Sequence, residues 1–284
     1  MADAEDRQGE NTPSSGLSSE DADSVAERKA GSAKVVHEVI RLQGDEELER
    51  PVGSLIFSGF AAGVAISVSV LAETFLKMRL PSQPWAELVV AFGYTVGFVI
   101  VIMGRLQLFT ENTVTAVLPI ATYPTVRNLR RLAKLWTTVL IANLVGTLLV
   151  AALMAGTVIV SSDQLAVALE ISTKTTTNSP LATLCLGMPA GFLVASIAWI
   201  LPNARGSEFW VIVLVTYIIA IGNFSHVVAG STEAWLMWLA GRISLAQACG
   251  NIILPALVGN IIGGTGLFAA LAHGQVRGEI KPDD

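Results

Sequence analysis

Two polar stretches interrupt long apolar runs: Gln107-Leu108-Phe109-Thr110-Glu111-Asn112-Thr113 in the first half of the chain and Asn223-Phe224-Ser225-His226 in the second. On either side of each stretch the sequence is apolar, and each interrupted run is long enough to cross a membrane. Helices broken at corresponding positions of a repeated membrane fold are typical of transport sites. The two stretches therefore predict a channel or transporter whose second and fifth membrane helices are broken.

The composition indicates a membrane protein. The 284 residues are 52% hydrophobic and only 14% charged, with a mean hydropathy of +0.59. Soluble domains carry about 25% charged residues, so we predict an all-α protein of the lipid bilayer. Cys185 and Cys249 lie in apolar runs, which argues against a disulfide framework or a thiolate metal site. We expect neither a metal nor a cofactor.

The charges are unevenly distributed. Residues 1–50 carry 13 of the 23 Asp and Glu residues but only 6 of the 18 Lys and Arg residues, so the net charge of −5 arises in this segment. No basic patch suggests a nucleic-acid partner. Residues 1–32 have almost no large apolar side chains and are predicted to be disordered. Residues 33–50 show an apolar stripe among charges, which fits an amphipathic helix that lies at the cytoplasmic membrane surface or packs beneath the bundle or, equally, a solvated lead-in.

Apolar runs of membrane length divide the membrane domain, residues 51–276, into six predicted spans. They cover residues 54–76, 88–104 (resuming after the interruption up to 120), 135–160, 180–201, 209–223 (resuming up to 240) and 246–272. Arg127, Arg130, Arg131 and Lys134 follow the second span, where we expect a loop. The excess of positive charge on cytoplasmic loops then predicts that both termini, including the polar tail 277–284, are cytoplasmic.

Short motifs recur in the two halves of the chain. Gly59-Phe-Ala-Ala-Gly63 matches Gly187-Met-Pro-Ala-Gly191, and Asn143-Leu-Val-Gly146 matches Asn260-Ile-Ile-Gly263, at offsets of 128 and 117 residues. The interruptions lie between these motifs, about 115 residues apart, near Phe109 and Phe224. Each half has three spans, an odd number, so the second half would start from the opposite side of the membrane. This predicts two inverted three-helix repeats with a site near the middle of the bilayer.

The interruptions offer chemistry for an anion. A helix that resumes after a break presents free N–H groups, which favour negative charge. Thr110 adds a hydroxyl, and His226 adds a side chain that titrates near neutral pH. The combination suits a small weak-acid anion that exchanges a proton with His226. Other interpretations stay open: His226 as a neutral core residue, Thr110 and Thr113 as helix caps, and Glu111 and Glu233 as caps or partners between helices.

Three strings resemble the formate/nitrite transporter family: Leu108-Phe109-Thr110, Phe224-Ser225-His226 and Gly259-Asn260-Ile-Ile-Gly263-Gly264. The resemblance extends over about residues 52–276, and the strings 107–119 and 46–50 resemble its YfdC-type branch of the bacterial inner membrane. It implies an aquaporin-like fold, a homopentamer with one pore in each subunit, and a multi-pass location in the inner (plasma) membrane. It further implies passage of small monovalent anions such as formate, nitrite or hydrosulfide, often with a proton.

The resemblance also implies site residues. Thr110 and His226 stand where the family has its threonine and its central histidine, and Lys174 stands where it has a vestibule lysine. The remaining expected pore residues are Tyr94, Phe98, Phe109, Val194 and Ile219 at the apolar constriction, with Leu108, Gln107, Ser225 and Asn260 in and beside the breaks. Gln107 and Ser225 replace acidic residues of the better-known members, Arg105 a small residue and Gly230 an asparagine. The substrate therefore does not follow from the resemblance.

Two other kinds of function compete with an anion channel. One is a pore for small neutral solutes, and the other is a membrane scaffold or sensor that acts through the acidic N-terminal segment. Flux of an anion responds to pH and membrane potential, whereas flux of a neutral solute does not. An enzyme is not expected, because the chain has no His-Glu-x-x-His motif and the neighbours Ser225 and His226 cannot face each other as nucleophile and base.

Overall fold

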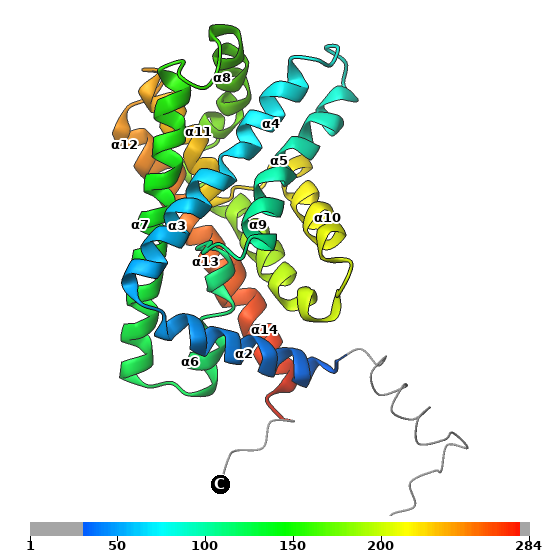
Figure 1. Ribbon diagram of the computed structural model, residues 1–284, viewed down its shortest axis with the longest axis vertical. Helices are drawn as coiled ribbons and strands as arrows, with labels where there is room; N and C mark the ends of the chain where they lie inside the picture. The colour runs from blue at the N-terminus through cyan, green and yellow to red at the C-terminus, as the bar shows by residue number, and fades with distance from the viewer. Residues whose placement is uncertain (1–30, 279–284) are drawn as a thin grey trace, which may run out of the picture.

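The computed structural model describes residues 31–278, so the predicted disorder of residues 1–32 and most of the tail lie outside the described part. Regular structure within residues 31–278 is helical throughout (Figure 1). Five helical segments are long and apolar enough to cross a membrane: Val52–Lys77, Ala86–Met103, Val126–Ala155, Pro180–Asn203 and Leu245–Val276. The chain is therefore an all-α protein with several candidate membrane spans.

The helices follow one another in this order: α2 (Ala33–Glu49), α3 (Val52–Ile66), α4 (Val68–Lys77), α5 (Ala86–Met103), η1 (Glu111–Thr113), α6 (Leu118–Thr122), α7 (Val126–Ala155), α8 (Ser162–Thr177), α9 (Pro180–Ile200), η2 (Leu201–Asn203), α10 (Glu208–Ile221), α11 (Val227–Leu239), α12 (Leu245–Gln247), η3 (Ala248–Ile253), α13 (Leu254–Ile261), η4 (Ile262–Ala269) and α14 (Ala270–Val276). The second predicted span thus consists of α5 followed by the short helices η1 and α6. The fifth consists of α10 and α11, which have 14 and 13 residues.

One local prediction was wrong. Arg127, Arg130, Arg131 and Lys134 do not lie in a loop, because α7 begins nine residues before the predicted span. Thr125 starts the helix, its side chain accepting a hydrogen bond from the N–H of Asn128 (3.1 Å). The segment between the third and fourth spans is also helical, since Ser161 and Gln164 form a capping box at the start of α8. The helices α8 and α2 lie at opposite ends of the bundle (Figure 1). We call these two ends the α8 face and the α2 face.

Two pairs of helices approach each other closely, α3 with α7 and α9 with α13. Glycines permit both approaches. A Cβ at Gly63 would lie 2.2 Å from the carbonyl oxygen of Asn143, and a Cβ at Gly191 would lie 2.2 Å from that of Asn260. The repeated Gly-x-x-x-Gly and Asn-x-x-Gly motifs therefore meet in each half of the bundle.

Replacing Gly191 with alanine is expected to destabilise the protein by about 2 kcal/mol, because the new methyl group forces α9 and α13 apart. Thermal unfolding in detergent measures the effect. Gly230→Ala in α11 is the matched control, since no atom lies within 4 Å of its added Cβ. Equal melting temperatures for the two variants would show that the glycine contact does not determine helix spacing.

The helix α2 lies across one end of the bundle, beside α6 and α14 (Figure 1). Gly44 brings its backbone against that of Thr115, 2.0 Å from where a Cβ would stand. His37 is fully buried, and its Nε2 lies 3.1 Å from Nδ1 of His273 in α14. Burial, followed by the nearby His273, lowers the pKa of His37, so His37 is neutral at pH 7. The segment predicted to be amphipathic is therefore packed against the other helices.

Candidate functional site

Both interruptions begin with the same turn. At the end of α5 the N–H of Leu106 donates to the carbonyl of Val101 (3.0 Å), and Arg105 has a φ of +53°. At the end of α10 the N–H of Phe224 donates to the carbonyl of Ile219 (3.0 Å), and Asn223 has a φ of +50°. This is the Schellman pattern of helix termination, which usually places glycine at the left-handed position. Each turn instead holds a larger residue, at a cost that the surrounding structure offsets.

One asparagine holds each break. The side chain of Asn143 accepts from the N–H of Phe109 (2.9 Å) and donates to the carbonyls of Gly59 (2.7 Å) and Gln107 (2.9 Å). The N–H of Phe109 and the carbonyl of Gln107 lie outside any helix and therefore have no helical hydrogen bond. The buried amide of Asn143 replaces these missing bonds.

Asn260 makes the same three bonds in the second half. Its side chain accepts from the N–H of Val227 (2.8 Å) and donates to the carbonyls of Gly187 (2.9 Å) and Ser225 (2.8 Å). Gln107 thus corresponds to Ser225 and Phe109 to Val227, an offset of 118 residues. This offset is three residues larger than the approximate 115 residues that separate Phe109 from Phe224.

A hydrogen bond joins the two breaks. Oγ1 of Thr110 lies 2.8 Å from Nε2 of His226, and both side chains are buried. Nδ1 of His226 accepts from the N–H of Ala229 (3.1 Å), so His226 caps α11. An accepting Nδ1 leaves the hydrogen of the neutral ring on Nε2, which then donates to Thr110. Thr110 keeps its own hydroxyl hydrogen for another acceptor. It does not cap η1, contrary to one interpretation of the sequence.

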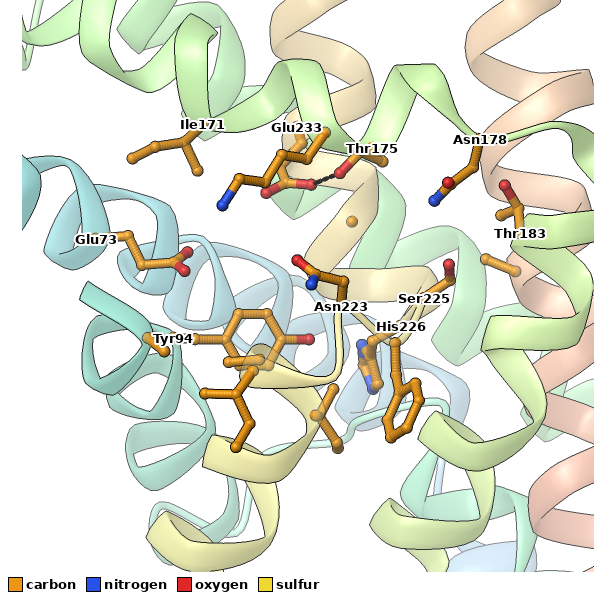
Figure 2. Close-up of a pocket in the computed structure, with 18 of the residues that line it drawn as sticks. Glu73, Tyr94, Ile171, Thr175, Asn178, Thr183, Asn223, Ser225, His226 and Glu233 are labelled. Carbon is orange, nitrogen blue, oxygen red and sulfur yellow. Dashed lines mark hydrogen bonds between the residues drawn. The ribbon is translucent and has the colours of Figure 1, made fainter. Parts of the chain in front are cut away.

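A cavity of about 210 Å³ extends from His226 toward the α8 face (Figure 2). Polar groups from five helices and from the second break line it. They are Glu73 of α4, Glu87 and Tyr94 of α5, Lys174 and Thr175 of α8 with Asn178 directly after it, Thr183 of α9, Glu233 of α11, and Asn223, Ser225 and His226 of the second break. Lys174 forms an ion pair with Glu87 at 2.7 Å, and Glu233 accepts a hydrogen bond from Thr175. Figure 2 shows the carboxyl groups of Glu73 and Glu233 on the same side of the cavity, away from His226.

A second, wider cavity of about 960 Å³ lies at the α2 face. Its lining includes Arg105 and Glu111 of the first break. The order of residues along α5 shows how far apart the cavities are, because Tyr94 lines the first and Ile102 the second. Eight residues of helix span about 12 Å. A layer of buried side chains therefore separates the two cavities.

Phe98, one of the predicted pore residues, belongs to this layer. Phe98 lies edge-on to His226, with ring centroids 5.0 Å apart, and contacts Tyr94 at 5.1 Å. Leu108, Phe109, Val194 and Ile219 are almost completely buried, and Ile219 also lines the cavity at the α8 face. The structure thus brings Thr110, His226, Phe98 and Tyr94 together, with Ser225 beside them and Lys174 in the cavity wall.

Gln107 has a different place. Its side chain donates to Glu47 of α2 (2.7 Å) and accepts from Asn112 (3.1 Å), and its N–H donates to Ser58 (3.0 Å). It therefore ties the first break to α2 and does not line either cavity. Sequence reasoning also overlooked Asn143, the equivalent of Asn260, although its Asn-x-x-Gly motif marked it. Glu233 lies seven residues into α11 and is a partner between helices, as one interpretation had it, and not a cap.

Known proteins resemble this chain over most of its length. The formate/nitrite transporter family matches residues 34–274. The inner membrane protein YfdC of Escherichia coli K12 is 37% identical over 90% of this chain and 82% of its own length. The formate channel BtFdhC of Bacillus thuringiensis is 24% identical over 84% of this chain and 92% of its own.

Solved structures show the same fold. A pentameric formate channel with formate bound has a TM-score of 0.65 at 20% identity, covering 80% of this chain and 97% of its own. An ion channel of the same family has a TM-score of 0.68 at 19% identity, covering 90% of this chain and 99% of its own. The match over residues 34–274 and the 37% identity to YfdC show that the chain belongs to the formate/nitrite transporter family.

Proposed function

We propose that this protein passes small monovalent anions of weak acids, such as formate or nitrite, through a pore that runs between the two cavities. The hydrogen bond between Thr110 and His226 carries the proposal, because it places a hydroxyl group directly beside a histidine that lines a polar cavity. The formate channels among its relatives support the substrate class.

The architecture we propose is six membrane spans in two inverted three-helix repeats, with α5–α6 and α10–α11 as the broken second and fifth spans. Asn143 and Asn260 make the same set of three hydrogen bonds in the two halves, which supports this architecture. The turns at Arg105 and Asn223, which share one geometry, support it as well. Basic residues of α7 at the α2 face support cytoplasmic termini. The pentameric relative supports a homopentamer in the bacterial inner membrane, with α2 at its cytoplasmic face and residues 51–276 as the membrane domain.

Backbone donors extend the proposed anion site. Within residues 31–278 neither the N–H of Thr110 nor that of Val228 has a hydrogen-bond acceptor. The two positions are 118 residues apart, so they are equivalent in the two halves. Together with the Thr110 hydroxyl they offer the anion three donors, where water would otherwise solvate it.

Proton transfer follows from the cost of charge in a buried layer. A charged side chain at the centre of a bilayer costs about 2.5–3.5 kcal/mol on insertion scales, and a neutral acid avoids most of this cost. We propose that the Thr110 hydrogen moves to the anion while the Nε2 hydrogen of His226 replaces it. His226 must first gain a proton on Nδ1, which opens its bond from the N–H of Ala229. Water in the cavity supplies that proton.

Thr110→Val is expected to lower formate flux roughly tenfold, because a hydrogen bond to a charged group is worth about 1.5–3 kcal/mol. Valine keeps the shape of threonine and removes the hydroxyl alone. Thr110→Ser, which keeps the hydroxyl, is the matched control and should retain most of the flux. Stopped-flow measurements on proteoliposomes give both rates, and equal rates for the two variants would remove the hydroxyl from the mechanism.

A further inference from the structure

The cavity at the α8 face contains more acidic than basic groups. Glu73, Glu87, Glu233 and Lys174 line it, so three carboxyl groups stand against one ammonium group. Positively charged residues would ordinarily surround an opening that leads to an anion site, because they attract the anion. The charges around this cavity therefore call for a physical explanation.

The lysines near the opening are engaged elsewhere. Lys174 pairs with Glu87, and Lys77 pairs with Glu87 at 3.0 Å and with Glu170 at 3.2 Å. Glu233 accepts a hydrogen bond from the hydroxyl of Thr175, which carries no charge. Within residues 31–278, Glu73 makes neither a hydrogen bond nor an ion pair. Glu73 and Glu233 thus have no cation within ion-pair distance.

The two carboxyl groups face one another across helices. The charged groups around Glu73 are Glu233 of α11, Lys174 of α8 and Glu87 of α5, and Lys174 is the charged neighbour of Glu233 on α8. Tyr94 of α5 also faces both carboxyl groups. Glu233 lies seven residues after His226, which corresponds to about 10 Å along α11. A solute that reaches His226 from the α8 face therefore first passes these carboxyl groups.

A second observation in the same cavity concerns Thr183. Its side chain is 2% exposed, and its hydroxyl has no hydrogen-bond partner within the described residues. Buried hydroxyls nearly always have a partner. Thr183 lines the cavity together with Ser225 and His226, so a polar solute in the cavity would supply what its hydroxyl lacks.

We propose that Glu73 and Glu233 make this opening select the uncharged form of a weak acid over its anion. The inference rests on the proposed function and specifies the form in which the substrate passes this opening: because the proton is exchanged at Thr110 and His226, the substrate is the neutral acid on the α8 side of that pair and the anion on the α2 side. Ionised carboxylates repel an anion and leave a neutral acid unaffected. Acidification lowers the negative charge of the carboxyl groups and raises the neutral fraction of the substrate, so both changes increase entry of the acid. Flux through this opening then falls more steeply with rising pH than the neutral fraction of the substrate does.

The test compares formate uptake at pH 8 and pH 5.5 in proteoliposomes. Glu73→Gln and Glu233→Gln should each raise uptake at pH 8 about tenfold and raise uptake at pH 5.5 by a smaller factor. Glu73→Asp, which keeps the charge, should keep the wild-type profile. Glu170→Gln is the matched control, because Glu170 is 65% exposed, pairs with Lys77 and does not line the cavity.

The outcomes separate the two proposals. If vesicles with the wild-type protein take up no weak acid at any pH, the proposed function is wrong, and this inference is wrong with it. Wild-type uptake together with unchanged profiles for Glu73→Gln and Glu233→Gln overturns the inference alone. Lower uptake at pH 8 in these variants also overturns it, because the carboxylates would then assist the anion. Size-exclusion profiles equal to the wild type establish that each variant is folded.

Discussion

Replacing His226 with asparagine is expected to lower formate flux about a hundredfold at pH 6 and by a smaller factor at pH 8. General acid–base groups contribute about 10²–10⁴-fold to the rates they assist, and asparagine cannot carry the proton. The fold should persist, since asparagine is a favoured N-cap and can accept the N–H of Ala229 in place of Nδ1.

The measurement is formate uptake into proteoliposomes over a pH series, with thermal unfolding as the check on the fold. His226→Ala separates the two roles of the ring, because alanine removes both the proton and the cap. It should lose stability as well as flux. If His226→Asn keeps the wild-type rate and pH profile, His226 is structural and the proton step is wrong.

Replacing Asn260 with leucine is expected to prevent the protein from folding. The change leaves the N–H of Val227 and the carbonyl of Ser225 without partners in a buried break, and it removes the bond that ties this break to the carbonyl of Gly187 in α9. Each unsatisfied buried group costs about 1–3 kcal/mol, and the sum approaches the whole stability of an ordinary domain, about 5–15 kcal/mol. Asn143→Leu should have the same effect in the first half.

Asn251→Leu provides the matched control, because Asn251 lies in the same last span and is exposed. The readout is the yield and the melting temperature of the purified protein in detergent. If Asn260→Leu folds and melts at the same temperature as Asn251→Leu, the breaks do not depend on the asparagines. This result would remove the main support for the inverted repeat.

The positions at which α5 and α10 end were predictable, because each helix ends at a local polar interruption in an apolar run. The alignment of the two interruptions with each other was not predicted, although the sequence contains a signal for it. Gly104-Arg105 and Gly222-Asn223 end the two apolar helices at an offset of 118 residues, and both second residues adopt the left-handed conformation. The two phenylalanines that were compared instead have different environments.

Other features depend on contacts that no local pattern reports. Gln107 bonds to Glu47, 60 residues earlier, only because α2 packs against the bundle. Glu73 was visible as a single carboxyl group within the first predicted span, and ionisable residues inside membranes are usually functional. Its significance emerged only when α4, α8 and α11 placed it beside Glu233 and the paired lysines.

The central claim is that Thr110 and His226 form a site through which a weak acid crosses the membrane. The most direct test is a flux panel of formate, nitrite, acetate, hydrosulfide and glycerol on proteoliposomes of the wild type and of Thr110→Val, with a pH gradient applied. The account predicts wild-type flux of one or more of the acids that rises when the outside is acidified, roughly tenfold slower flux in the variant, and no response of glycerol flux to pH. Glycerol flux that exceeds flux of every acid, or acid flux that is equal in the two proteins, would contradict it.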